Sequence, residues 1–169
     1  GVQTCALPIS LHSGPIAYFL TWTTYGSWLP GDPRGWMSRG GNARASRPRL
    51  HDVMMRQLPQ TTVTLSVSER QIVQQAIGTT CIRRGWVLHG SQCRTQHAHA
   101  VITAADEQPK TVLVQSKSWA TRTLDAASGR AHLPRRWWTR GGSIRFVYGE
   151  RALEQVVEYV MECQDRPRS

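Results

Sequence analysis

The sequence predicts an α+β fold built around one antiparallel sheet. Stretches rich in β-branched and aromatic residues alternate with stretches whose apolar residues recur at helical spacing. Two of the strand-like stretches follow each other across a short turn, as in a hairpin. The resulting order of elements is explained most simply by a ferredoxin-like βαββαβ fold with one helix added at its C-terminal end.

The first half of the chain is expected to contain one strand, one long loop and one helix. Aromatic and β-branched residues predict the strand at 16–24. Glycines, prolines and five arginines follow, so we expect a long basic loop at about 25–60. Apolar residues at helical spacing predict a helix that ends near Arg84, with Ser66 or Ser68 as its N-cap.

The second half is expected to contain a hairpin, a helix, a strand and a final helix. The hairpin turns at residues 90–94, where glycine and polar residues gather. Pro109 suits the first turn of a helix because its missing N–H has no partner there anyway. The predicted elements are two hairpin strands, a helix, a strand and a helix, at residues 85–89, 95–103, 109–126, 143–148 and 150–164.

Length and composition limit the class of protein. The chain has 169 residues, and we expect residues 10–169 to form one domain. Residues 1–9 look like a translated sequencing adapter, without the basic and apolar regions of a signal peptide, and are expected to be non-native. No apolar run approaches the roughly 20 residues of a membrane-spanning helix, which excludes an integral membrane protein.

The four cysteines are scattered and form no CxxC pair. They are expected to be reduced thiols of an intracellular protein rather than a disulfide framework or a zinc ribbon. These residues are Cys5, Cys81, Cys93 and Cys163.

The charge predicts a polyanionic partner. Lys and Arg number 21 against 11 Asp and Glu, for a net charge of +10. Such a surplus in one small domain is typical of nucleic-acid binding. All but two of the cations are arginines, which bind phosphate with two N–H groups and stack on bases. An alternative explanation for part of this bias is a GC-rich genome, which would favour arginine codons.

Particular cations and tryptophans are candidates for DNA contact. Trp28, Trp36, Trp137 and Trp138 fall in predicted loops, where they are expected to stack on unpaired bases. Trp22 and Trp86 fall on predicted strands and are expected in the core. The cations expected to contact DNA are Arg34, Arg39, Arg44, Arg47, Arg49, Lys117, Arg122 and Arg140.

The chemistry-bearing residues are a histidine pair and a tyrosine. His97 and His99 are two apart on a predicted strand, so both imidazoles face the same way. The spacing fits a metal site, Zn²⁺ included, and equally fits two histidines that make ordinary hydrogen bonds. On the final helix, Gln164 continues an apolar stripe and needs a polar partner, and Tyr159 lies on the shoulder of that stripe.

These residues lie in two of five motifs whose order and content resemble one family. The sequence resembles the single-tyrosine HUH transposases, of the REP-associated tyrosine transposase and small insertion-sequence type. The resemblance covers nearly all of residues 18–165. The motifs are TWTTYGSWLPGD (21–32), QHAHAV (96–101), KSWATR (117–122), WWTRGGS (137–143) and EYVMECQ (158–164).

The resemblance implies a bacterial cytoplasmic enzyme that cuts and rejoins single-stranded or hairpin DNA. His97 and His99 would be metal ligands, Gln164 the third ligand, and the metal Mg²⁺ or Mn²⁺. Tyr159 would be the nucleophile that forms a 5′-phosphotyrosine link. The resemblance also implies a possible homodimer, in which Tyr159 completes its own site or that of a partner.

The sequence departs from the family at two points. Residue 96 is Gln where many relatives have Asn before the first His. Gln164 stands five residues after Tyr159, where a spacing of four is frequent, so Glu162 is kept as a second candidate ligand. Tyr148, at the end of the last predicted strand, is the other candidate nucleophile. Two other functions fit the residues: a nucleic-acid-binding module of this fold that has lost catalysis, and a Zn²⁺-dependent hydrolase that uses the histidine pair.

Overall fold

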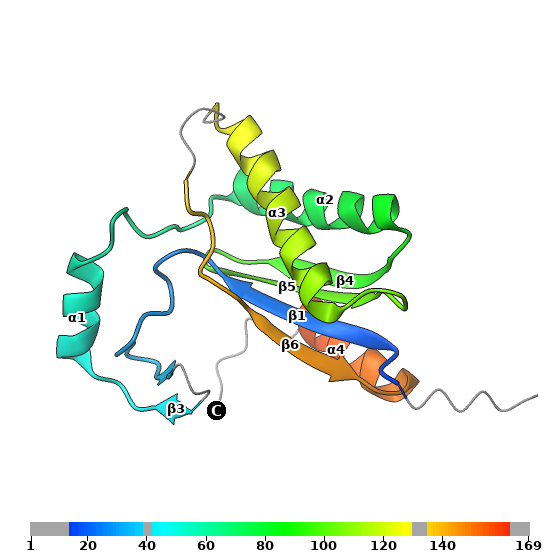
Figure 1. Ribbon diagram of the computed structural model, residues 1–169, viewed down its shortest axis with the longest axis horizontal. Helices are drawn as coiled ribbons and strands as arrows, with labels where there is room; N and C mark the ends of the chain where they lie inside the picture. Colours follow the sequence, from blue (N-terminus) through cyan, green and yellow to red (C-terminus); the bar gives the residue numbers. More distant parts are fainter. Residues whose placement is uncertain (1–13, 39–41, 130–134, 163–169) are drawn as a thin grey trace, which may run out of the picture.

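A four-stranded antiparallel sheet organises the protein (Figure 1). The computed structural model describes residues 14–38, 42–129 and 135–162. The strands lie in the order β4-β5-β1-β6, and every neighbouring pair is antiparallel. They are β1 (Ala17–Thr23), β4 (Val87–Cys93), β5 (His97–Thr103) and β6 (Ser143–Val147). This strand order is that of the predicted βαββαβ fold, so the α+β prediction is confirmed.

Helices cover both faces of the sheet. α2 (Val67–Arg84) and α3 (Pro109–Ala127) pack on one face, and α4 (Glu150–Glu162) lies against β4 and β5 on the other (Figure 1). The N-cap of α2 is Ser66, one of the two predicted candidates, and it forms a capping box: its hydroxyl accepts from the Glu69 N–H, and the Glu69 carboxylate accepts from the Ser66 N–H. No helix in the described part is long and apolar enough to cross a bilayer.

The alternation of side chains along β1 divides the apolar residues into two cores. Leu20 and Trp22 point toward α2 and α3 and join the larger core. Ala17 and Phe19 point toward α4 and join a smaller core around Val160. Both the predicted core tryptophans, Trp22 and Trp86, belong to the larger core. Cys81 and Cys93 are buried in it as free thiols.

The predicted turn at residues 90–94 is wrong. β4 continues through these residues to Cys93, and its pairing with β5 shifts register between Leu88 and Gly90. A glycine inside a strand marks such a bulge as readily as it marks a turn, and local sequence does not distinguish the two. Gly90 lies beneath α4, where Val157 and Met161 pass close to it.

The predicted loop at 25–60 contains regular structure, and we call residues 25–58 the arm. Figure 1 shows the arm extending away from the sheet. It contains a short ribbon of β2 (Trp36–Met37) with β3 (Ala43–Arg44), and then α1 (Pro48–Arg56). None of the α1 residues is buried. The expectation of an irregular loop is wrong for this segment, because Leu50, Val53 and Met54 recur at helical spacing. Gly31 has φ +88°, and an added Cβ would lie 2.5 Å from the Arg47 carbonyl.

The backbone at Gly142 lies so close to β1 and α3 that a side chain there should destabilise the protein. A Cβ at this position would lie 2.8 Å from the Thr21 carbonyl oxygen and 3.0 Å from a methyl carbon of Leu113. We expect Gly142→Ala to lower the free energy of unfolding by about 1–3 kcal/mol, because β1 or α3 must shift. Denaturant unfolding measures this change.

Gly78 provides the control. It lies inside α2, and an added Cβ there would meet no atom within 4 Å. Gly78→Ala should therefore raise the free energy of unfolding by about 0.5–1 kcal/mol, because alanine loses less backbone entropy than glycine in a helix. Equal effects of the two substitutions would contradict the proposed contact at Gly142.

Candidate active site

The histidine pair lies on the face of the sheet that α4 covers. His97 and His99 stand on β5 with their ring centroids 4.8 Å apart. Ala98 between them points to the opposite face and joins the larger core. The prediction that both imidazoles share one face is therefore confirmed.

Tyr159 on α4 is brought to the same place. Its ring centroid lies 6.3 Å from that of His99 and 6.1 Å from that of Phe19. Phe19 in turn stacks on His99 at 5.5 Å. Val160, the next residue, is fully buried, whereas 41% of Tyr159 is exposed. The phenol thus stands at the edge of the helix–sheet interface, where a substrate can reach it.

Thr21 orients the ring of His99. The two residues are directly opposite each other in the β1–β5 register, and the Thr21 Oγ1 lies 2.8 Å from the His99 Nδ1. When Nδ1 carries the proton, its N–H donates a hydrogen bond to the threonine hydroxyl, and Nε2 keeps its lone pair free for a ligand. Neither Phe19 nor Thr21 was a predicted site residue, although Thr21 begins the motif at 21–32. Once the pairing of β1 with β5 is known, their register identifies them.

Burial keeps His99 neutral. It is 7% exposed. Loss of water around the ring lowers its pKa to about 4, and the nearby His97 and Arg94 act in the same direction. A neutral imidazole is the form that binds a cation.

The other candidate nucleophile, Tyr148, lies far from the histidines. His99 pairs with Thr21, which pairs with Ser143 at the beginning of β6. Tyr148 comes five residues later, beyond the other end of this strand. At about 3.3 Å per residue, this is a separation of about 17 Å along the sheet. The geometry therefore favours Tyr159.

The two candidate third ligands lie at or beyond the end of α4. Gln164 lies outside them, as does Arg39. Glu162, the second candidate, is exposed at the end of α4. In the part of the chain that the structure describes, no group of three His, Cys, Asp or Glu side chains could hold a metal ion.

The predicted DNA-binding cations fall into two groups. Arg34 and Lys117 bind other parts of the protein. The Arg34 guanidinium donates to both carboxylate oxygens of Asp32 and to the Ser27 carbonyl. Lys117 donates to the carbonyl oxygens of Thr139 and Gly141. The other predicted DNA-binding cations that the structure describes are exposed. They lie on the arm, on α3 and on the segment before β6: Arg44, Arg47, Arg49, Arg122 and Arg140.

Asp32 is a buried residue that was not among the predicted site residues. Its hydrogen bonds organise the base of the arm. It is 3% exposed, and the hydrogen bond from the Arg34 side chain lowers the pKa of its carboxyl. Arg34 also lies over the ring of Trp28, with its guanidinium carbon 4.9 Å from the ring centroid. The cation is thus a structural partner of both residues.

The loop tryptophans differ in exposure. Trp28 is 46% exposed, which leaves it accessible to a base. Trp137 is only 2% exposed, so the expectation that it contacts DNA is wrong. Its indole N–H donates to the Asp125 carboxylate, and α3 covers its ring in the core. Segment 135–139 lacks strand periodicity, but it pairs with the end of β1 through the Thr24–Trp138 bridge.

Solved structures of two transposases are among those similar to this chain. One is a REP-associated tyrosine transposase bound to a REP hairpin, with 13% identity, a TM-score of 0.47 and 87% of this chain covered. The matched part spans 65% of the length of that transposase. The other is a candidate transposase from Deinococcus radiodurans R1, with 12% identity, a TM-score of 0.45 and 95% of both chains covered. No protein-family model and no curated protein matches the sequence.

The lowered pKa of the buried His99 should make the free energy of unfolding depend on pH. Its pKa is about 4 in the folded protein and near 6.5 in the unfolded chain, so the unfolded state takes up a proton first as the pH falls. The free energy of unfolding should therefore decrease between about pH 6.5 and pH 4. At about 1.4 kcal/mol for each pKa unit, the loss approaches about 3 kcal/mol.

Urea unfolding at pH 7 and pH 4.5 measures this effect, and His99→Gln is the control. Glutamine does not titrate, so this variant should lose less stability over the same interval, with the other titrating groups unchanged. If both proteins lose the same stability between these pH values, His99 is not the group responsible.

Proposed function

We propose that this protein nicks and rejoins single-stranded DNA, as a transposase of the single-tyrosine HUH type, through a 5′-phosphotyrosine intermediate. The observation that carries the proposal is the convergence of His97, His99 and Tyr159. These residues come from a strand and a helix about 60 positions apart, yet their rings lie within one contact cluster. The motifs of the sequence agree with this function.

The residues present fit a divalent cation. Two imidazoles share one face 4.8 Å apart, and the buried His99 is neutral well below pH 7. His97 and His99 would hold the ion, with Gln164 as the proposed third ligand and Glu162 as the alternative. The resemblance favours Mg²⁺ or Mn²⁺. Such an ion polarises the scissile phosphate and offsets the charge that develops on it.

Tyr159 would form the covalent bond. Its oxygen attacks the phosphorus atom, and the phenolic proton passes to a water molecule, which can reach the 41% exposed side chain. The new O–P bond forms as the bond to the 3′-oxygen breaks, and that oxygen leaves and takes up a proton. One ester bond replaces another, so a 3′-hydroxyl can reverse the step without an external energy source.

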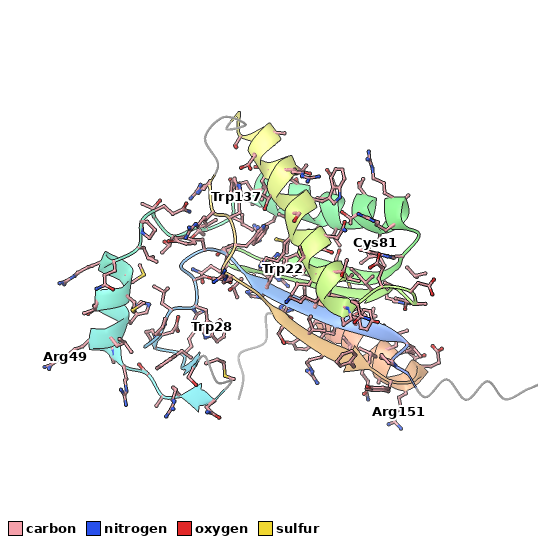
Figure 2. All side chains as sticks on the ribbon, viewed as in Figure 1. Trp22, Trp28, Arg49, Cys81, Trp137 and Arg151 are labelled. Carbon is pink, nitrogen blue, oxygen red and sulfur yellow. The ribbon has the colours of Figure 1, made fainter. Side chains whose placement is uncertain are left out.

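The arm would hold the DNA beside this site. The backbone N–H of Thr24, just before the arm, donates to the carbonyl of Gln96, the neighbour of His97. The arm and the histidine pair therefore share one end of the sheet. Arg47 and Arg49 are exposed, and Figure 2 shows Arg49 on the outer side of α1. Exposed arginines suit contacts with phosphates along a strand.

A covalent-adduct assay tests the catalytic proposal. The protein is mixed with pooled single-stranded hairpin oligonucleotides and Mn²⁺ or Mg²⁺, denatured, and digested, and any DNA-linked peptide is identified by mass spectrometry. We expect a metal-dependent adduct on Tyr159. Tyr159→Phe should abolish it because the attacking oxygen is absent, and His97→Ala should abolish it because a metal ligand is lost.

Two matched variants serve as controls. Tyr148→Phe removes the distant tyrosine, and His89→Ala removes a histidine that bonds Thr103; both should form the adduct at the wild-type level. An adduct on Tyr148 would overturn the choice of nucleophile. DNA binding without an adduct would favour the non-catalytic binding module, and Zn²⁺-dependent hydrolysis without an adduct would favour the hydrolase.

The role of the arm is tested by the salt dependence of DNA affinity. The slope of log K against log salt is negative. For the double variant Arg47→Ala/Arg49→Ala we expect its magnitude to decrease by about 1.4, at about 0.7 for each lost contact with single-stranded DNA. Arg151→Ala, at the opposite end of the molecule in Figure 2, should leave the slope unchanged. An unchanged slope in the double variant would exclude these contacts.

A further inference from the structure

A cavity of about 410 Å³ lies between α3 and the segment that leads into β6. Its walls combine an apolar surface with positive charge. Leu113, Val114 and Trp138 supply the apolar part. The cations that line it are Lys110, Lys117, Arg135, Arg136 and Arg140. An aromatic surface inside a set of cations is suited to a ligand with a flat π face and a negative charge.

Hydrogen bonds hold the walls of the cavity in place. The indole N–H of Trp138 donates to the Thr121 hydroxyl on α3, and its ring packs edge-on against Trp22. The Gln60 side chain bonds both the N–H and the carbonyl of Arg136. The Lys117 ammonium ties α3 to the opposite wall through the Thr139 carbonyl. A cavity fixed in this way loses little entropy when it binds a ligand.

The cavity lies close to the histidine pair. The Thr139 N–H donates to the Thr23 carbonyl, and the two hydroxyls lie 2.7 Å apart. Thr23 is directly opposite His97 in the β1–β5 register. Because neighbouring strands are about 4.8 Å apart, the Thr139 backbone lies about 10 Å from that of His97. The cavity lies against α3, whereas the imidazoles lie on the face that α4 covers, so a single strand of DNA that reaches both must pass around the edge of the sheet at Thr139.

A second cavity continues the same surface. Its volume is about 610 Å³, and it shares four residues with the first: Arg136, Trp138, Thr139 and Arg140. Tyr25 and Leu58 of the arm close its far side. The two cavities therefore follow one another from α3 toward the arm.

We propose that the cavity between α3 and residues 135–141 binds one unpaired nucleotide of the DNA, with its base against Trp138 and its phosphates beside Arg136 and Arg140. This inference rests on the DNA binding in the proposed function. It assigns the cavity a role in selecting the DNA, because a base that is bound in a fixed cavity near the cleaved phosphate determines which phosphate reaches Tyr159. An acidic peptide would match the charge but not the aromatic surface.

Photo-crosslinking tests the proposal. The probe is a single-stranded oligonucleotide of 12 nucleotides, each with 5-iodouracil as its base. On irradiation, this base forms a covalent bond with an aromatic ring that it contacts. After irradiation and digestion with trypsin, we expect the crosslink in the peptide that begins at Trp137 and ends at Arg140. Because Trp137 is 2% exposed, the linked ring should be Trp138.

Ser118→Glu is the matching variant. Ser118 is an exposed residue of α3 that lines the cavity, and glutamate there adds bulk and negative charge while it preserves helix propensity. Its crosslink to Trp138 should decrease at least tenfold. Ala126→Glu makes the same charge change on an exposed part of α3 outside the cavity and should crosslink within about twofold of wild type.

The outcomes separate this inference from the catalytic proposal. Crosslinks confined to Trp28 or Trp36 of the arm, or an undiminished Trp138 crosslink in Ser118→Glu, would overturn the inference even if the Tyr159 adduct forms. A Trp138 crosslink that Ser118→Glu removes supports the inference, even if no adduct forms and the catalytic proposal fails. Absence of any crosslink in the wild type would also overturn it.

Discussion

The antiparallel pairing of β1 with β5 is the constraint on which the candidate site depends. It sets Thr21 opposite His99 and Thr23 opposite His97. Side chains alternate along a strand, so a shift of one residue would turn both imidazoles into the apolar core and Ala98 toward α4. That core contains Ala98 and Trp22, and the cost of burying two imidazoles there opposes such a shift.

α4 completes the site because it covers this face of the sheet only in part. Val160 is buried against the sheet, and its neighbour Tyr159 remains at the edge of the interface. The aromatic ring of Phe19 contacts the tyrosine ring edge-on and stacks on His99 as well. A single helix–sheet contact thus both stabilises the smaller core and places an accessible hydroxyl beside the two imidazoles.

The excess of positive charge serves two purposes in this fold. Some cations hold the protein together: Arg34 binds the buried carboxylate of Asp32, and Lys117 ties α3 to residues 139–141. In Lys117, burial lowers the pKa of the ammonium, and the two carbonyl oxygens offset the lost hydration. Arginines exposed on the arm, such as Arg47 and Arg49, are the ones we propose for DNA.

The sequence by itself determined the order of the four sheet strands and of the three helices that cover them, the shared face of His97 and His99 and the apolar stripe of α4, because these follow from local periodicity. Only the tertiary structure decided which tyrosine lies beside the histidines, since strand register places Tyr148 at the far end of β6. It likewise buried Trp137 and Asp32. Side chains distant in sequence meet through packing and strand register, and local patterns contain no information about either.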